Sequence, residues 1–529
     1  MPKHKGGKVA AVIDIGSSDV KMQISQVRNK EIIPLNTLEY PLKLGHEVFN
    51  YGKISFECLR ELSHILTGYS NVMKEYGVDQ YKVVGTTALR EAQNKEFIQD
   101  QLLIQNDMIV EIYDDNQEKS LIYSAITKAL KHMELFSTQS NLKEQAKQPE
   151  NMLLSYIGTG SIGISLYNGK HIFFTQNIST GSLKLHDVLS GVQEYTDDFA
   201  IVVDEYLDSI FNRIQMPVPY QQVNGLVLTG NEMQRIAKLC NAEPIDGNYV
   251  IKSKTLTNLY QTIRLMPLEK IALKFDLTEE VAEMFYSSLA IYAKLLKFTE
   301  ADYVFAPKVD LWDTLIEQML VQKRALNEVV ETREHALACA KTVADRYRCN
   351  YEHANFLMET ACMIFDKIKT LHGLNPSYKL LLEIAAILHD CGYFINSKHH
   401  LNSNVDIVKY TDIYGLTDKT TLITAYISRF AESETPNYRD AEFASLKGSE
   451  KIIALKLAAI FRLANSLDKS QKQKLQSVKV RLDEDNKFII TAKSDSNTRL
   501  EHWAFEKCSA FFQEVFGVQP VLTVKSSLI

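Results

Sequence analysis

The chain has 529 residues, of which 45% are hydrophobic and 23% are charged, a balance typical of globular rather than disordered proteins. This length exceeds what one hydrophobic core usually supports, so several domains are expected. Lys and Arg total 59 against 65 Asp and Glu, a formal net charge of −6. That charge argues against a nucleic-acid coat protein and confines any polyanion site to a local pocket.

The N-terminal stretch and the cysteines indicate a cytoplasmic protein. The apolar run that follows the basic residues 1–8 is soon interrupted by Asp14, so it is too short for a signal peptide or a membrane span. The seven cysteines are scattered without metal-ligand spacing, which favours a reducing compartment. We therefore expect neither a membrane nor a nucleic acid among the partners.

In chain order, residues 9–26 predict a buried strand, a Gly/Ser turn at Gly16 and a second strand. Helical periodicity follows over 56–75, then a strand over 81–84 and a helix that carries Arg90.

A strand over 110–113 leads into a helix near Gln117, which Asn116 is expected to cap. Residues 137–151 are polar and predict a loop. The strand–glycine turn–strand pattern then recurs around Gly158, with a further strand over 171–179. Residues 223–240 predict a strand, a Thr-Gly turn and a helix.

The last 200 residues have a different pattern. Long apolar-periodic helices without clear strands are expected over 323–475, with a typical apolar face at 380–388. A hairpin turned at 483–486, a helix over 503–516 and a strand over 520–526 predict a small α+β region at the end.

Two glycine turns carry the candidate chemistry. Gly16-Ser17-Ser18 and Gly158-Thr159-Gly160-Ser161 would expose backbone N–H groups that form concave anion sites. Asp14, at a strand end, is placed to hold Mg²⁺. Arg90 could donate a fork of hydrogen bonds to phosphoryl oxygens.

These motifs, in this order, resemble the exopolyphosphatase/guanosine pentaphosphate phosphatase (Ppx/GppA) family. IDIGSSDVK is similar to its first phosphate loop, and YIGTGSIG corresponds to its second. GTTALREAQN, residues 85–94, is very close to the family's Thr-Ser-Ala-Leu-Arg-x-Ala-x-Asn signature. EIYDDNQEKSLIY lies where the family has Gly-x-Glu-Glu-Ala-Arg-Leu, and STGSLKL and LVLTGN match its later glycine turns.

The resemblance implies an α/β fold with two actin-like (ribonuclease H-like) lobes, an all-α HD-type domain and a small α+β C-terminal domain. The expected domains are lobe I over 1–132, lobe II over 133–322, the helical HD-type domain over 323–475 and the C-terminal domain over 476–529. It also suggests a homodimer.

The resemblance further implies hydrolysis of the terminal phosphoanhydride of inorganic polyphosphate, or of the 5′-phosphate of guanosine pentaphosphate. The family's catalytic glutamate falls on Glu118, which would orient or deprotonate the attacking water while Arg90 and Mg²⁺ stabilise the transferred phosphoryl group. The other reading of Glu118 is a helix N-terminal carboxylate. The substrate-binding candidates are Gly16, Ser17, Ser18, Lys21, Thr87, Gly158, Thr159, Gly160, Ser161 and Gly230, and the metal candidate is Asp14.

Four positions depart from the family pattern. The metal-ligating Asp that opens the second loop is Tyr156, and the Glu that closes it is Gly163. A hydroxyl residue of the first loop is Asp19, and the Arg after the catalytic Glu is Ser120. Since one lost electrostatic contact can cost about 10²–10³ in rate, hydrolysis could be slow.

In the helical region an HD-type site needs His, a His-Asp pair and a distant Asp around a divalent metal. His353, His389 and Asp390 fit the first three positions, and His399 and His400 fit a later His pair. Other expected ligand positions are occupied by Asn465, with Asp468 nearby, Asn402 and Ser428. Two readings therefore remain open: these residues bind a second divalent metal, or the histidines only pack in the core of the domain. The basic residues Lys398, Arg429 and Lys469 could instead help this domain extend substrate binding.

Three functional readings follow. The first is the Mg²⁺-dependent phosphatase, and the second is a weakened family member that binds or senses polyphosphate or an alarmone without efficient turnover. The third, an actin-like sugar kinase, is disfavoured by residues 85–94 and by the HD-type extension.

Overall fold

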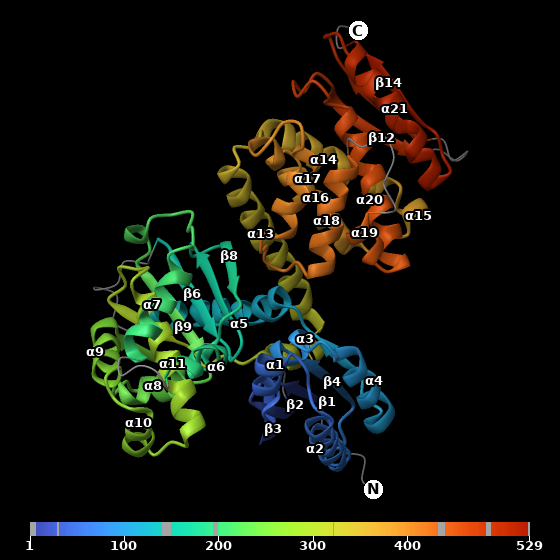
Figure 1. The fold of residues 1–529 in the computed structure, drawn as a ribbon. Helices are drawn as coiled ribbons and strands as arrows, with labels where there is room; N and C mark the ends of the chain where they lie inside the picture. Colours follow the sequence, from blue (N-terminus) through green and yellow to red (C-terminus); the bar gives the residue numbers. More distant parts are fainter. Residues whose placement is uncertain are drawn as a thin grey trace. The chain divides into compact units, whose positions relative to one another are not determined.

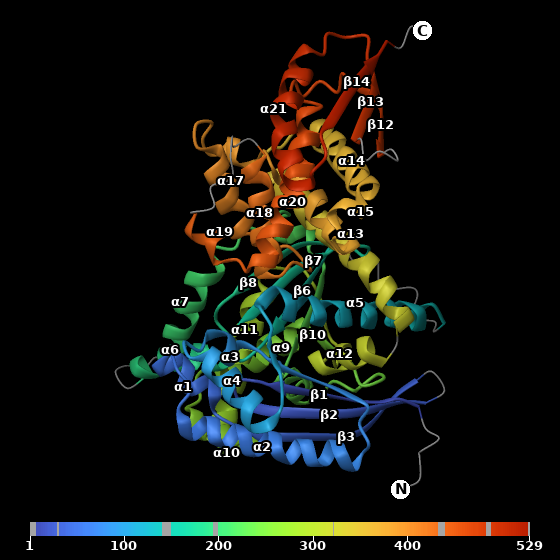
Figure 2. The ribbon, with the colours of Figure 1, turned by 90° about the vertical axis from the view of Figure 1, so that its right-hand side faces the viewer.

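The computed structural model describes residues 7–28, 31–139, 150–193, 199–320, 322–431, 440–482 and 488–526. They form two compact units, which divide between Thr332 and Arg333 (Figures 1 and 2). Within these ranges, every helix is too short or too polar to cross a membrane.

The first unit begins with a five-stranded sheet, counted over the described residues. Its strands are β1 (Val9–Ile15), β2 (Asp19–Arg28), β3 (Glu31–Pro41), β4 (Gln80–Gly85) and β5 (Val110–Ile112). The order is β3-β2-β1-β4-β5, with β1, β2 and β3 antiparallel and β4 and β5 parallel to β1. β1 is central and buried along its length except at the partly exposed Asp14, which is why its sequence is a continuous apolar run.

Helices cover both faces of this sheet. They are α1 (Leu44–Tyr51), α2 (Phe56–Glu75), α3 (Thr87–Glu91), α4 (Lys95–Asn106) and α5 (Asp115–Gln139). On one face, α2 buries its apolar stripe, including Leu62 and Leu66, in the same core as Ile13 and Met22. Against the other face lies a helix from much later in the chain, α12 (Leu311–Leu320), which packs Leu315 and its neighbours against Val12 and Val84.

The start of α5 differs from the sequence prediction. Asp114 Oδ1 accepts a hydrogen bond from the Gln117 N–H at 2.8 Å, so Asp114 supplies the capping oxygen. Asn116 lies inside the helix, and its Oδ1 accepts instead from the Asn177 side chain at 2.6 Å. The prediction that Asn116 caps this helix is wrong because the helix begins one residue before it.

A second sheet repeats the first. Its strands in the described ranges are β6 (Met152–Ile157), β7 (Ile162–Tyr167), β8 (Ile172–Ile178), β9 (Gly225–Gly230), β10 (Tyr249–Lys252) and β11 (Tyr303–Ala306). The strand order of this second sheet is β8-β7-β6-β9-β11-β10. Its first five strands have the same order and the same relative directions as β3-β2-β1-β4-β5 of the first sheet. The sixth strand, β10, pairs antiparallel with β11. This repeat confirms the predicted α/β fold with two actin-like lobes.

Helices α6 to α11 cover the second sheet. They are α6 (Ser182–Gln193), α7 (Phe199–Phe211), α8 (Met233–Leu239), α9 (Ser253–Ile263), α10 (Leu268–Phe275) and α11 (Glu279–Leu296). α11 contributes Phe285, Leu289 and Tyr292 to the core, all fully buried.

The second unit is mainly helical. Its helices are α13 (Gln322–Arg346), which begins in the first unit, α14 (Tyr351–Lys367), α15 (Lys369–His372), α16 (Lys379–Leu388), α17 (His400–Lys409), α18 (Asp418–Phe430), α19 (Ala441–Ser445), α20 (Gly448–Ser466) and α21 (Arg499–Phe516). α16, where the apolar face was predicted, is buried from Leu381 to Leu388.

A small sheet completes this unit. β12 (Gln476–Leu482), β13 (Phe488–Lys493) and β14 (Pro520–Lys525) lie in that order, with β14 parallel to β13. α21 packs on the sheet through Phe512, whose ring stacks on Phe488 with centroids 5.0 Å apart. The hairpin turn predicted at 483–486, and residues 140–149 of the predicted polar loop, lie outside the described residues.

Candidate active site

The two glycine turns have the same closing hydrogen bond. The Gly16 N–H donates to the Asp19 carbonyl at 2.9 Å, and the Gly158 N–H donates to the Ser161 carbonyl at 3.0 Å. Each turn joins the central strand of its sheet to the neighbouring antiparallel strand. The two turns are therefore equivalent parts of the structural repeat.

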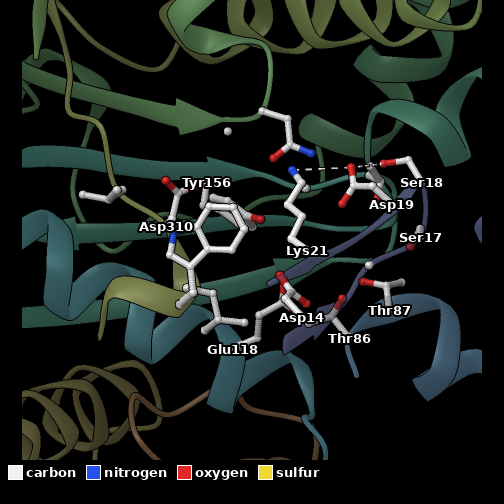
Figure 3. A pocket seen from close by; sticks show the side chains of 18 residues that line it. Asp14, Ser17, Ser18, Asp19, Lys21, Thr86, Thr87, Glu118, Tyr156 and Asp310 are labelled. Atoms are coloured by element: carbon white, nitrogen blue, oxygen red, sulfur yellow. Dashed lines mark hydrogen bonds and ion pairs between the residues drawn. The ribbon is translucent and has the colours of Figure 1, made fainter. Parts of the chain in front are cut away.

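Both turns open onto one cavity of about 60 Å³ (Figure 3), large enough for several waters. Its lining consists of Asp14, Gly16, Ser17, Ser18, Asp19, Lys21, Thr86, Thr87, Glu118, Tyr156, Gly158, Thr159, Gly230, Asn231, Val309, Asp310, Leu311 and Trp312. The structure thus brings together Asp14, Glu118 and most of the predicted substrate-binding residues. Arg90, Gly160 and Ser161 lie outside this lining.

Gly160 lies where the two lobes pack closely. A Cβ atom at this position would lie 2.2 Å from Thr87 Cγ2 and 3.0 Å from the Phe49 ring. Only glycine therefore allows the second turn to contact Thr87, which begins the helix of the 85–94 signature. This packing explains why Gly160 supports the cavity without lining it.

Acidic side chains converge on the cavity. Burial, together with the carboxylates of Asp19 and Glu118, raises the pKa of Asp14 to about 7. Asp14 Oδ1 is buried and has no hydrogen-bond partner in the described part of the chain. Burial and the nearby Asp313 raise the pKa of Asp310 to about 6. An unsatisfied carboxylate oxygen beside other carboxylates suits a hard divalent cation such as Mg²⁺.

Lys21 supplies positive charge on the first-turn side of the cavity. Its Nζ lies 3.4 Å from Asp19 Oδ2 and 5.7 Å from the centroid of the Trp312 ring. Asp19 Oδ2 also accepts from the Ser18 hydroxyl at 2.9 Å. The negative charge that Asp19 introduces into the first loop is thus partly compensated by Lys21.

Glu118 is buried and held between two cations. Arg90 Nη1 donates to Glu118 Oε2 at 3.2 Å, and Lys119 Nζ lies 3.4 Å from Oε1. Arg90 also donates to the Tyr113 carbonyl at 2.7 Å and to the Thr87 hydroxyl at 2.9 Å. Arg90 therefore acts on the cavity through Glu118, which it fixes in place.

Asp115 extends this network to the second turn. Its Oδ1 accepts from Arg90 Nη2 at 2.8 Å and from the Ser161 hydroxyl at 2.9 Å. Lys119 Nζ donates to the same hydroxyl at 2.8 Å. Burial opposes ionisation of Asp115, but Lys119 and Arg90 outweigh it and lower the pKa of this carboxyl. Ser161 is thus a link between the lobes.

Lys119 also fills the space beside two of the positions that depart from the family. Its Nζ lies 5.0 Å from the centroid of the Tyr156 ring. A Cβ atom at Gly163 would lie 2.5 Å from Tyr123 Oη and 3.0 Å from Lys119 Cδ. A glutamate at position 163 therefore has no room unless both Tyr123 and Lys119 move. The Tyr156 ring forms part of the cavity wall, and the cavity remains open beside it.

Sequence reasoning missed the segment 309–312, which contributes Asp310 and Trp312 to the lining. These residues follow β11 and begin α12. The sequence did contain a signal for Asp310, since it is a carboxylate that follows a buried strand. The same pattern identified Asp14 as a metal candidate. Thr86 and Asn231 were also missed, although each adjoins a residue that was predicted.

The second unit brings three predicted ligands together. His353, His389 and Asp390 each offer a ligand atom within 4.8 Å of the other two. His353 Nδ1 lies 2.8 Å from Asp468 Oδ2, which leaves the opposite ring nitrogen to face the cluster. Asp468 thus orients His353, as the carboxylate partner of a ligand histidine does.

The other positions predicted for the HD-type site lie outside the cluster of His353, His389 and Asp390. The His400 ring stacks on Tyr393 with centroids 4.0 Å apart, and neither His399 nor His400 joins a potential metal-binding group in the described ranges. Asn465 lines a different pocket of this unit.

Comparison with known proteins gives one family match and several similar structures. Residues 337–507 match the family model for domain III of the Ppx/GppA phosphatases. The chain is similar to the Ppx/GppA family member of Aquifex aeolicus, with 20% identity over 60% of this chain and 98% of that one and a TM-score of 0.48. It is also similar to an exopolyphosphatase from Cytophaga hutchinsonii, with 18% identity over 59% of this chain and 98% of that one and a TM-score of 0.47. Residues 337–507 are therefore similar to domain III of the Ppx/GppA phosphatases.

Proposed function

We propose that this protein hydrolyses the terminal phosphoanhydride bond of inorganic polyphosphate or of guanosine pentaphosphate. The observation that carries the proposal is the convergence of both glycine turns and Glu118 on one cavity. The domain III match at residues 337–507 supports the reaction class.

The turns would bind the terminal phosphoryl group through their backbone. No described residue accepts a hydrogen bond from the Ser17 or Thr159 amide, and both residues line the cavity. Such N–H groups carry partial positive charge and hold phosphoryl oxygens well. Lys21 adds a positive point charge beside the first turn.

A magnesium ion fits the acidic side of the cavity. Asp14, with its unpartnered Oδ1, and Asp310 would hold the ion through carboxylate oxygens. Bound there, Mg²⁺ would neutralise charge on the phosphoryl oxygens.

Glu118 would orient the attacking water by accepting its hydrogen bond. The contacts from Arg90 and Lys119 fix the carboxylate so that one geometry is available when substrate arrives. Arg90 is then a positioning residue, since it contacts Glu118 and lies outside the cavity lining.

Phosphate release tests this proposal. Purified protein with Mg²⁺ should release phosphate from polyphosphate or guanosine pentaphosphate, and Glu118→Gln should reduce kcat by about 10²-fold or more. Glu96→Gln, an exposed change on α4, is the control and should retain full activity. Equal rates for the Glu118 and Glu96 variants would refute the role of Glu118.

The alternative is a protein that binds or senses these polyanions without efficient turnover. Tyr156 and Gly163 favour it, because they stand where the family pattern has carboxylates and Lys119 occupies the space beside them. This reading predicts that polyphosphate raises the Tm while wild type and Glu118→Gln release no phosphate.

We further propose a second divalent metal at His353, His389 and Asp390, in an HD-type domain, and a cytoplasmic homodimer. None of the seven cysteines, all of which lie in the described ranges, forms a disulfide, which agrees with a reducing compartment. Metal analysis of wild type against His389→Ala tests the metal site, and light scattering of the full chain tests the dimer.

A further inference from the structure

The second unit contains a cavity of about 410 Å³ that the proposed hydrolysis does not use. It lies between α20 and α21, which pack side by side (Figures 1 and 2). The lining residues are Ala431, Arg462, Asn465, Ser466, Lys469, Trp503, Ala504, Lys507 and Cys508.

This lining is strongly basic. Arg462, Lys469 and Lys507 contribute three cations, and the described lining contains no Asp or Glu. The two lysines are exposed, whereas the Arg462 side chain is almost completely buried. Three positive charges line one cavity, a composition that suits an anionic ligand.

Arg462 is the most informative member of this set. The residue is 6% exposed, and its Nε and Nη1 atoms have no hydrogen-bond partner in the described ranges. Stacking against Phe511, 4.9 Å from the ring centroid, satisfies one face of the guanidinium but none of its N–H groups. Burying a charged donor without a partner is costly, so a ligand that accepts these hydrogen bonds is expected.

Neighbouring groups do not neutralise this charge. Burial raises the pKa of the Cys508 thiol, although the charge of Arg462, its hydrogen bond with the Cys508 side chain and the charge of Lys469 oppose the shift. A neutral thiol is a weak partner that leaves the charge of Arg462 in place. Lys469 follows the C-terminal end of α20 and could compensate the helix dipole. Arg462 lies a full turn before that end, so the dipole does not explain it.

We propose that this cavity binds the phosphate groups of a small phosphorylated ligand, at a site separate from the catalytic cavity. The planar fork of Arg462 would donate hydrogen bonds to two oxygens of one phosphate group, and Lys469 and Lys507 would donate to further oxygens. The proposal rests on the second unit alone, so it stands whether or not the first unit hydrolyses polyphosphate.

The two tryptophans of the chain allow each cavity to be observed separately. Trp312 lines the catalytic cavity and Trp503 lines this one. The full-length Trp312→Phe variant therefore carries Trp503 as its single tryptophan, which is excited selectively at wavelengths that tyrosine does not absorb. Lys507 Nζ lies 4.3 Å from the Trp503 ring centroid, so a ligand that moves this ammonium changes the emission.

We would titrate the Trp312→Phe protein with sodium tripolyphosphate and, separately, with GTP, at constant ionic strength. A saturable change in emission is expected with at least one of them. Tighter binding of tripolyphosphate identifies an inorganic chain as the ligand, and tighter binding of GTP identifies a nucleotide. Sodium citrate serves as the non-phosphate anion.

Lys469→Gln and Lys507→Gln are then introduced together into the Trp312→Phe protein. This double substitution should weaken binding of the phosphate ligand by about tenfold or more, since charge-assisted hydrogen bonds are lost. Both side chains are exposed, so the fold should persist. Lys479→Gln with Lys525→Gln, exposed lysines of the same unit outside the lining, removes the same charge and should change the Kd less than about twofold.

An unchanged Trp503 emission with both phosphate ligands overturns the proposal. Equal weakening by the two double variants also overturns it, because it would show nonspecific charge attraction. Citrate binding as tight as that of the phosphate ligands would assign the cavity to carboxylates instead.

Discussion

Asp14 and Tyr156 occupy equivalent positions in the two sheets, and both face the same cavity. Each lies two residues before the glycine that begins its turn. In the antiparallel register Asp14 is paired with Lys21, and Tyr156 is paired with Gly163. The structural repeat therefore presents a carboxylate from one lobe and a neutral phenol from the other, since burial first of all raises the pKa of Tyr156.

Restoring this symmetry should make the protein depend on Mg²⁺ for stability. Tyr156→Asp adds a carboxylate beside Asp14, Glu118 and Asp310, so repulsion should lower the Tm in EDTA. Added Mg²⁺ should recover the loss and raise the Tm more than it does for wild type. Tyr156→Phe, which keeps the ring, is the control. A Mg²⁺ response of Tyr156→Asp no larger than that of Tyr156→Phe would contradict the prediction.

Lys119 should be essential for the stability of the first unit. Lys119→Met removes one of the two cations that hold Glu118 and Asp115 and leaves only Arg90, and removing one partner of a buried ion pair costs about 3–5 kcal/mol. Lys128→Met, on the same helix, breaks a more exposed pair with Glu317 and should cost at most about 1 kcal/mol. Urea unfolding of both variants measures the difference. Similar losses would show that the buried network contributes little.

Asp115 should contribute stability that disappears in acid. Its folded-state pKa is below the usual value of 3.8, so the contribution is fully present above that value and is lost as the pH falls through the folded-state pKa. Asp115→Asn should therefore lower the Tm relative to wild type at pH 6 and have a smaller effect below pH 4, with Asp100→Asn as the exposed control. A difference in Tm that is constant from pH 6 to pH 3 would rule out this linkage.

Asp468 should tune the proposed metal site of the second unit. Asp468→Asn removes the carboxylate that orients His353, and loss of such a partner typically weakens metal binding by about 10–100-fold. Calorimetric titration with Mn²⁺ or Zn²⁺ measures the affinity. Asp366→Asn, at an exposed residue of the same helix as His353, should leave it unchanged. Equal affinities of the two variants would place the metal, if any, elsewhere.

Local sequence determined most strands of both sheets and the positions of the glycine turns, whereas β3, β10 and β11 were not predicted. The buried apolar run before Gly16 and its repetition before Gly158 are short-range patterns, because side-chain alternation and glycine turns act over a few residues. The family signature at 85–94 likewise identified Thr87 and Arg90. The cap of α5 was predicted at the wrong residue. Asp114 and Asn116 are both good capping residues, and sequence alone places a helix end only to within one or two residues.

The tertiary structure decided which of these residues face the cavity. Asp310 and Trp312 reach it from far along the chain because α12 returns to pack on the first sheet. Arg90 turns away to hold Glu118, a choice that depends on partners on another helix. Local patterns specify strands and turns, whereas convergence, burial and charge pairing arise from contacts between distant segments, and these exist only in the folded protein.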